Sequence, residues 1–307
     1  MMERRGGLHM EKSELLRIRQ LTVEFGPGEH AVEAIRDVSL DVGSGSIVAL
    51  IGESGSGKSV TARSVFGLLD RSGRVTAGEV WLDGTDLLRL KPRQIRGRRG
   101  KDMAMIFQDP ANCLNPVLTV GAQMIETIRR HRRVSRREAT ALAIAQLARV
   151  GLPDPAGLWR RYPFQISGGM CQRVMIALAL VSGARLLIAD EPTTALDVMS
   201  QAQILDELGR LRQSGIGILL ITHDLSVVAE IADRVYVMKA GRLVEAGDVY
   251  DIFERPRHDY TRMLLDSRCL RPHPIEETAM PRGGKHAYRN GVADQNVSTG
   301  SEVVLQG

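Results

Sequence analysis

Short apolar runs alternate with longer segments of helical periodicity along most of this 307-residue chain. Apolar runs of about four to eight residues predict buried strands, and apolar residues three and four positions apart predict helices that cover them. The predicted strands are residues 15–24, 35–42, 46–51, 79–82, 103–107, 185–189 and 217–221. The predicted helices are residues 60–69, 170–182, about 198–213 and a segment that follows Asp224. Strands separated by helices favour an α/β fold whose parallel sheet binds ligands at the carboxyl ends of its strands.

One stretch interrupts this alternation. Residues 119–150 carry only helical patterns, and Ser135 with Glu138 forms a capping box at the start of one helix. We therefore expect an inserted helical subdomain over about residues 110–165, separate from the sheet.

The last part of the chain changes character near Leu270. Residues 234–245 predict a hairpin around Ala240 and Gly241, but apolar periodicity stops after about residue 270. A polar segment without such periodicity buries too little surface to order itself. The expected organisation is an N-terminal extension (1–14), a folded domain (15–270) and a disordered tail (271–307).

Composition is that of an ordinary globular protein, with 43% hydrophobic and 25% charged residues and a formal net charge of +5. The positive charge gathers in two basic runs, which could bind nucleic acid or an anionic membrane surface or could simply be solvated. No aromatic residue lies within either run, which disfavours stacking on single strands. The runs are Arg89, Lys91, Arg93, Arg96, Arg98, Arg99 and Lys101, and Arg129, Arg130, Arg132, Arg133, Arg136 and Arg137.

Cysteine usage and apolar run length restrict the compartment. The three cysteines are widely separated and give neither a disulfide framework nor a metal-ligand spacing, so a reducing compartment is expected. The longest apolar stretch, residues 174–181, is far shorter than the roughly 20 residues that cross a bilayer. Residues 1–10 lack the apolar region of a signal peptide. Any membrane association is therefore expected to come through a partner.

A glycine-rich segment between a predicted strand and a predicted helix fits the pattern G-x-x-x-x-G-K-[ST]. Backbone N–H groups of such a loop wrap nucleotide phosphates, the lysine supplies a point charge and the hydroxyl is a Mg²⁺ ligand. The alternative is a glycine-rich turn with a solvated lysine, which the flanking strand and helix disfavour. This phosphate loop comprises Gly52, Glu53, Ser54, Gly55, Ser56, Gly57, Lys58 and Ser59, and Val60 continues it into the helix.

The apolar strand at residues 186–189 ends in two acids, Asp190 and Glu191. Burying two carboxylates without a cation is costly, and a Mg²⁺ ion would relieve that cost. Asp190 would hold the ion, while Glu191 would orient and deprotonate the water that attacks a γ-phosphate. Two surface acids at a strand end are the alternative, which the phosphate loop disfavours.

Ser167, Gly168 and Gly169 precede the predicted helix over residues 170–182, and alone they indicate only an N-cap. Together with the phosphate loop, however, the segment Ile166-Ser167-Gly168-Gly169-Met170-Cys171-Gln172-Arg173 resembles the signature of ATP-binding cassette (ABC) ATPases. In that family the signature of one subunit closes on nucleotide held by the phosphate loop of another. The resemblance thus implies a dimer.

The resemblance covers about residues 15–265 and implies a P-loop NTPase (RecA-like) core with an N-terminal antiparallel β subdomain and an inserted α-helical subdomain. It implies ATP and Mg²⁺ as cofactors. In such proteins His223 would contact the γ-phosphate, and Gln108 would reach the metal and the attacking water. Residues 195–197 would link the two sites of the dimer. Adenine would stack on an aromatic residue near the N-terminus, for which Phe25 is the first candidate and His30 the second.

Five further segments resemble the dipeptide/oligopeptide/nickel importer subfamily: 108–110, 114–116, 162–165, 190–197 and 257–261. This resemblance implies an ATPase subunit at the cytoplasmic face of a bacterial inner membrane that energises uptake of peptides. It also implies a second ATPase subunit, identical or related, two transmembrane permease subunits and a periplasmic solute-binding protein, with no nucleic acid.

Other functions remain open at this point. An importer of nickel or another small solute is one alternative, because solute selection in the subfamily belongs to other subunits. A soluble ABC ATPase acting on ribosomes or DNA is another, and only the basic runs support it. A scaffold without catalysis would require loss of Lys58, Asp190, Glu191 or His223, and all four are present.

Overall fold

The computed structural model describes residues 14–108, 113–194 and 196–267. Several sequence predictions therefore lie wholly or partly outside the described residues. These are the N-terminal extension apart from Glu14, residues 109–110 of one subfamily segment, the start of the expected helical subdomain (110–112), Ala195 of the loop expected to link two sites, the end of the expected folded domain (268–270) and the tail over residues 271–307.

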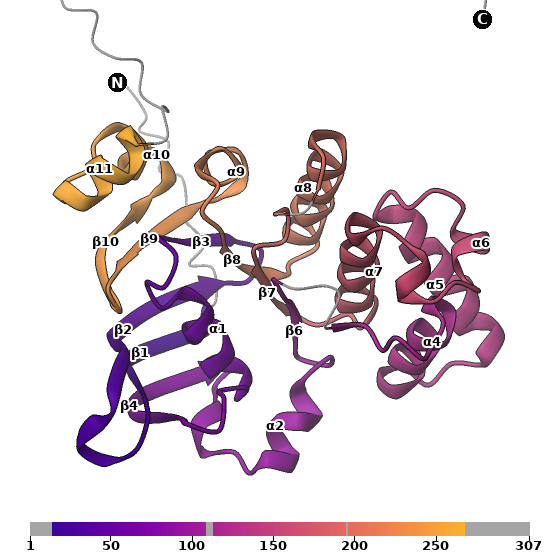
Figure 1. Ribbon diagram of the computed structural model, residues 1–307, viewed down its shortest axis with the longest axis horizontal. Helices are drawn as coiled ribbons and strands as arrows, with labels where there is room; N and C mark the ends of the chain where they lie inside the picture. Colours follow the sequence, from indigo (N-terminus) through magenta and orange to yellow (C-terminus); the bar gives the residue numbers. More distant parts are fainter. Residues whose placement is uncertain (1–13, 109–112, 195, 268–307) are drawn as a thin grey trace, which may run out of the picture. The chain divides into compact units, whose positions relative to one another are not determined.

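Two sheets form the framework of the described residues (Figure 1). The strands are β1 (Glu14–Phe25), β2 (Val32–Gly43), β3 (Ile47–Ile51), β4 (Gly73–Leu82), β5 (Thr85–Asp86), β6 (Met103–Ile106), β7 (Leu186–Asp190), β8 (Gly217–Ile221), β9 (Arg234–Lys239) and β10 (Arg242–Asp248). One sheet is antiparallel in the order β2-β1-β4-β5, and the other has the order β10-β9-β3-β8-β7-β6. In the second sheet β6, β7, β8, β3 and β9 are parallel, and β10 returns antiparallel to β9. The predicted α/β fold with a parallel sheet is thus confirmed.

Helices cover one face of the parallel sheet, and the antiparallel sheet with α1 packs on the other. The helices are α1 (Lys58–Phe66), α2 (Pro92–Arg98), α4 (Val120–His131), α5 (Arg136–Arg149), α6 (Pro155–Leu158), α7 (Gly168–Val181), α8 (Val198–Gln213), α9 (Leu225–Ile231), α10 (Val249–Glu254) and α11 (Asp259–Asp266). Short 3₁₀ turns lie at η1 (Gly28–His30), η2 (Leu87–Arg89) and η3 (Pro163–Gln165).

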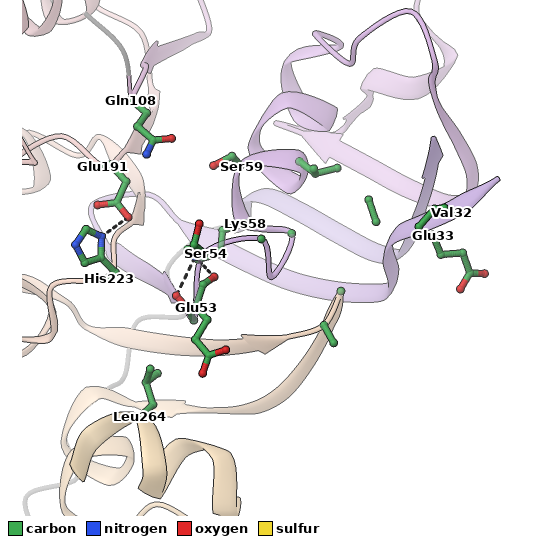
Figure 2. A pocket seen from close by; sticks show the side chains of 17 residues that line it. Val32, Glu33, Glu53, Ser54, Lys58, Ser59, Gln108, Glu191, His223 and Leu264 are labelled. Atoms are coloured by element: carbon green, nitrogen blue, oxygen red, sulfur yellow. Dashed lines mark hydrogen bonds and ion pairs between the residues drawn. The ribbon is translucent and has the colours of Figure 1, made fainter. Parts of the chain in front are cut away.

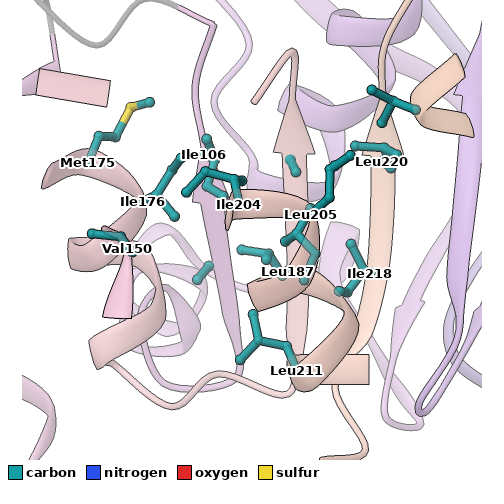
Figure 3. Packing of buried hydrophobic residues seen from close by; sticks show 14 of the residues in the cluster. Ile106, Val150, Met175, Ile176, Leu187, Ile204, Leu205, Leu211, Ile218 and Leu220 are labelled. Carbon is teal, nitrogen blue, oxygen red and sulfur yellow. The ribbon is translucent and has the colours of Figure 1, made fainter. Parts of the chain in front are cut away.

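Burial of the central strands on both faces explains their continuous apolar sequences. Along β3, Ile47, Ala49 and Ile51 contact the helical side, whereas Val48 and Leu50 contact the antiparallel sheet and α1. Figure 3 shows side chains of β6, β7 and β8 packed against those of α7 and α8. Burial of each Leu or Ile side chain stabilises the fold by about 1.5–3 kcal/mol. This packed core therefore holds the strand ends in place, and polar residues follow directly after them.

The described residues between β6 and α7 carry the helices α4, α5 and α6, as the helical pattern over residues 119–150 predicts. Its capping box is present, because Ser135 Oγ accepts the Glu138 N–H and the Glu138 carboxylate accepts the Ser135 N–H. Buried side chains of α4 and α5 such as Met124 and Leu147 share one apolar cluster with α7. The boundaries of a separate subdomain stay a prediction.

The first basic run contains a helix that the apolar pattern does not predict. In α2 the helical residues are mostly arginine, glutamine and glycine, and Pro92 starts the helix because its fixed φ suits the first turn. Arg98 pairs with Asp102, and Arg99 donates to the carbonyls of Phe66 and Gly67 at the end of α1. Part of this run therefore serves packing of α2 against α1.

Within the described residues, no helix combines the length and the apolar character needed to span a membrane.

Candidate functional site

Polar residues that follow four parallel strands meet around one cavity of about 710 Å³ (Figure 2). The phosphate loop follows β3, Gln108 follows β6, Glu191 follows β7 and His223 follows β8. Parallel strands end at the same edge of a sheet, which brings these residues together although they are far apart in sequence. Gln108, Glu191 and His223 therefore share one site with the phosphate loop, of which every candidate except the buried Ser56 lines the cavity.

The phosphate loop opens directly into α1 at a glycine that no other residue could replace without strain. Gly57 has a φ of +107°, and a Cβ there would lie 2.6 Å from Ile35 Cγ2 and 2.9 Å from Met238 Cε. The first N–H groups of α1 have no partners within the helix and lie at the positive end of its dipole. This geometry is suited to an anion, phosphate above all.

Lys58 is buried within the loop it is expected to serve. Its ammonium donates to the carbonyl oxygens of Gly52 at 2.9 Å and Glu53 at 2.8 Å. Burial lowers the pKa of Lys58, while the carboxylates of Glu191, Asp190 and Glu53 oppose that shift. A buried ammonium held by neutral carbonyls gains more from charged oxygens, so phosphate can displace these contacts.

Asp190 at the end of β7 and Ser59 at the start of α1 place two oxygen atoms together that could be ligands of a metal ion. The Ser59 hydroxyl donates to Asp190 Oδ1 at 3.1 Å, and Asp190 is only 3% exposed. Burial raises the pKa of Asp190, and the hydrogen bond from Ser59 acts in the opposite direction. A cation beside this carboxylate would stabilise its ionised form.

These donors fit Mg²⁺, which takes few protein ligands and completes its shell with phosphate oxygens and water. Among the described residues, no group of three His, Cys, Asp or Glu side chains could hold a metal ion by itself. An ion at Ser59 and Asp190 would therefore depend on a bound phosphate, and Gln108 lines the same cavity.

Glu191 is fixed in orientation by neighbours on both of its oxygens. Its Oε1 lies 2.7 Å from His223 Nδ1 (Figure 2). Its Oε2 accepts the Thr194 hydroxyl at 3.1 Å. The backbone has a φ of +53°, unusual for a side chain with a Cβ, and its N–H donates to the Ile221 carbonyl at 2.8 Å. A carboxylate held this way beside the cavity is placed to take a proton from water.

The signature segment, residues 166–173, lies apart from the phosphate loop of its own chain. Ser167 caps α7 by accepting the Met170 N–H at 3.3 Å, and Gly168 faces open space. No residue of this segment lines the cavity. Ser167, Gly168 and Gly169 thus present the N-terminus of α7 without a phosphate site of this chain opposite it.

The signature helix nevertheless contacts the loop that carries Glu191. Gln172 donates its side-chain amide to the Pro192 carbonyl, directly after Glu191. Arg173 donates to Ser200 Oγ and forms an ion pair at 3.7 Å with Asp197, which caps α8. Helix α7 is therefore in direct hydrogen-bond contact with the residue that follows Glu191.

The adenine candidates are not among the cavity-lining residues. The Phe25 ring packs against Gly73 and the apolar residues between the antiparallel sheet, α1 and the parallel sheet, and His30 belongs to η1. Val32, the cross-strand neighbour of Phe25, lines the cavity and is 69% exposed. Stacking of adenine on Phe25 stays a prediction.

Several lining residues were missed by the motif analysis, because they belong to elements that meet the loop only in three dimensions. The hairpin turn between β9 and β10 was predicted, but its position over the phosphate loop has no local signal. The missed residues are Val32, Glu33, Ala34, Ala240, Gly241 and Leu264.

Comparison with known proteins gives consistent matches. Residues 35–194 match the family model described as ABC transporter. The chain is 48% identical to the dipeptide transport ATP-binding protein DppD of Bacillus subtilis, over 84% of this chain and 77% of that protein. It is 48% identical to a putative peptide import ATP-binding protein of Brucella melitensis, over 90% of this chain and 83% of that protein. A dimeric ATP-binding cassette solved in a post-hydrolysis state with ADP and Pi is 27% identical, with a TM-score of 0.71 over 76% of this chain and 99% of that chain.

Proposed function

The chain belongs to the ABC transporter family, and from that premise we propose that it is the ATP-hydrolysing subunit of an importer that takes up peptides across the bacterial inner membrane. One observation carries the ATPase part of the proposal. The carboxylate of Glu191 is held by His223 at the edge of the cavity that the phosphate loop also lines. The peptide part rests on the names of the similar proteins.

Binding of the triphosphate would use the N-terminus of α1. The loop N–H groups would surround the β- and γ-phosphates, and Lys58 would exchange its two carbonyl partners for phosphate oxygens. Ser59 and Asp190, with Gln108 nearby, would hold Mg²⁺. When bound, Mg²⁺ neutralises negative charge on the β- and γ-phosphate oxygens.

Hydrolysis would depend on Glu191 as general base. The carboxylate accepts a proton from water as the water oxygen bonds to the γ-phosphorus and the bond to the bridging oxygen of ADP breaks. His223 fixes the orientation of that carboxylate and would also contact the γ-phosphate. The products are ADP and inorganic phosphate.

A second chain would complete the site. Because Ser167, Gly168 and Gly169 lie outside the cavity, the positive end of α7 can meet the γ-phosphate only of another subunit. We propose a second ATPase subunit, identical or related, two transmembrane permease subunits and a periplasmic binding protein. The subunit would then lie at the cytoplasmic face of the inner membrane as a peripheral protein.

Uptake measurements test the proposal. In a strain that lacks its own copy, the full chain should restore uptake of a radiolabelled dipeptide. Lys58→Ala should not restore it, whereas Lys101→Ala, an exposed lysine outside the cavity, should. Restored uptake of radiolabelled nickel instead of dipeptide would contradict the peptide part. Purification with nucleic acid in a salt-sensitive manner, and without permeases, would contradict the transport role.

A further inference from the structure

A tyrosine from the last described helix contacts the phosphate loop. Tyr260 on α11 is 3% exposed, and its phenolic oxygen accepts the backbone N–H of Glu53 at 3.1 Å. Lys239 Nζ lies 4.6 Å from the centre of the tyrosine ring, and Leu264 on the same helix lines the cavity (Figure 2). Nothing in the hydrolysis chemistry above requires this contact.

The hydrogen bond from Glu53 completes a clamp on one peptide unit. The carbonyl of Gly52 and the N–H of Glu53 belong to the same peptide plane. Lys58 donates to that carbonyl at 2.9 Å, and Tyr260 accepts from that N–H at 3.1 Å. The plane is therefore held at both ends by side chains from different elements.

The clamped peptide follows Gly52, whose backbone conformation is one that residues with a side chain rarely adopt. Gly52 has a φ of +152°, and a Cβ there would lie 2.1 Å from the Met238 carbonyl oxygen, so no side chain can stiffen this position. When Lys58 turns to the phosphates, the Gly52 carbonyl loses its partner. Tyr260 is then the remaining side-chain contact of the clamp.

We propose that Tyr260 is a positioning residue for the Gly52–Glu53 peptide. When Lys58 gives up the Gly52 carbonyl to bind phosphate, Tyr260 keeps this peptide, and with it the phosphate loop, in the phosphate-binding conformation. Without this contact, ordering the loop would cost conformational entropy at each binding event, and nucleotide affinity would fall. The inference rests on the ATP-binding role proposed above.

Tyr260 can act this way because α11 is itself firmly attached. The Glu245 carboxylate on β10 accepts the N–H groups of Arg257 at 2.7 Å and His258 at 3.0 Å. Arg262 donates to the carbonyls of Pro256 and Arg257. Burial raises the pKa of Tyr260, so the phenol stays neutral in physiological conditions and its oxygen accepts a hydrogen bond.

Tyr260→Phe tests the inference because it removes the phenolic oxygen and leaves the ring under Lys239. In the full-length chain we expect the Kd for ATP, measured by calorimetric titration, to rise about 3- to 10-fold. In the assembled transporter the KM for ATP should rise by the same factor with kcat nearly unchanged, because the contact is the same in ground and transition states.

Tyr236→Phe is the matched control. Tyr236 is also buried, and its phenolic oxygen accepts the Asp41 N–H at 3.3 Å, which joins β9 to β2 away from the cavity. It should lose comparable thermal stability without a change in Kd. An unchanged Kd in Tyr260→Phe, or an equal rise in Tyr236→Phe, would overturn the positioning role. Failure of the unaltered chain to bind ATP would instead contradict the proposed function.

A second variant removes both contacts of residue 53 with the phenol, the backbone hydrogen bond and the interaction with the Glu53 carboxylate. Glu53→Pro has no N–H to donate, so adding Tyr260→Phe in that background should leave the Kd unchanged. An equal loss of affinity in both backgrounds would refute the inference. If Tyr260→Phe does not fold, hydrogen exchange of the unaltered chain tests whether the Glu53 N–H stays hydrogen-bonded when ATP is bound. Slow exchange of the Glu53 amide with ATP bound supports the clamp, and exchange at the rate of an open amide contradicts it.

Discussion

Replacement of Glu191 by Gln removes the proposed base while changing the shape of the side chain very little. The amide oxygen of Gln can still accept the Thr194 hydroxyl, and the side chain can still approach His223. It cannot accept a proton from water at neutral pH. The phosphate loop, Ser59 and Asp190 keep their contacts, because Glu191 is hydrogen-bonded to none of them.

The size of the expected effect follows from the role. A positioned general base contributes about 10²–10⁴-fold, so a loss of about 10³ in kcat corresponds to roughly 4 kcal/mol of activation free energy. ATP binding should persist or become tighter, because a carboxylate that stabilises the buried Lys58 also repels the triphosphate. The variant is therefore expected to hold ATP without hydrolysing it.

Phosphate release from the assembled transporter and ATP titration of the full chain measure the two quantities. Glu230→Gln, an exposed acid on α9 outside the cavity, is the control and should match the unaltered protein in both assays. Hydrolysis by Glu191→Gln within about tenfold of the unaltered rate would refute the general-base role, since that is less than the contribution of such a group. Loss of ATP binding with normal folding would show that the carboxylate stabilises the phosphate loop instead of acting as the base.

Two further predictions concern Gly57, which lines the cavity, and Asp190, which contacts the lining residue Ser59. Asp190→Asn should abolish the Mg²⁺-dependent part of ATP binding and raise the Tm of the nucleotide-free protein. Because burial raises the folded-state pKa of Asp190, its carboxyl destabilises the fold progressively as pH rises from about 4, its unfolded value, to the folded value. The difference in Tm between Asp190→Asn and the unaltered chain should therefore grow over that pH window and then stay constant. Scanning calorimetry across pH in the absence of Mg²⁺ measures this difference. A difference that shrinks as pH rises would contradict the prediction. Gly57→Ala places a Cβ 2.6 Å from Ile35 Cγ2 at a φ of +107°, so it should cost more than about 1 kcal/mol of unfolding free energy and prevent ATP binding; a denaturant midpoint equal to that of the unaltered chain would contradict it.

The parallel sheet was predictable because its strands are buried on both faces. Residues such as those of β3 must be apolar throughout, and this leaves an unbroken local signal. The polar residues after these strands were predictable for the same reason, since the strand ends fix where they must meet. The apolar pattern thus predicted the sheet and the strand ends at which a ligand binds, whereas His223 was assigned to the site only through family resemblance.

Other features have no local signal. Helix α2 is held by Arg99 at its C-terminal end, which donates to two carbonyls at the end of α1, and a run of arginines has no apolar periodicity. The contact of Tyr260 with Glu53 joins residues 207 positions apart, and only the folded chain reveals it. Family resemblance implied only that His223 contacts the γ-phosphate, and the structure alone shows its contact with Glu191.

The central claim is that one triphosphate is held between the phosphate loop of one chain and the signature segment of another. Sedimentation velocity of Glu191→Gln with Mg-ATP tests this claim most directly. One sample contains the variant alone, and the other contains the variant together with the second ATPase subunit. The account predicts an ATP-dependent dimer that Ser167→Arg abolishes, although each chain still binds ATP. Persistent monomers in both samples, or a dimer that Ser167→Arg leaves intact, would contradict the claim.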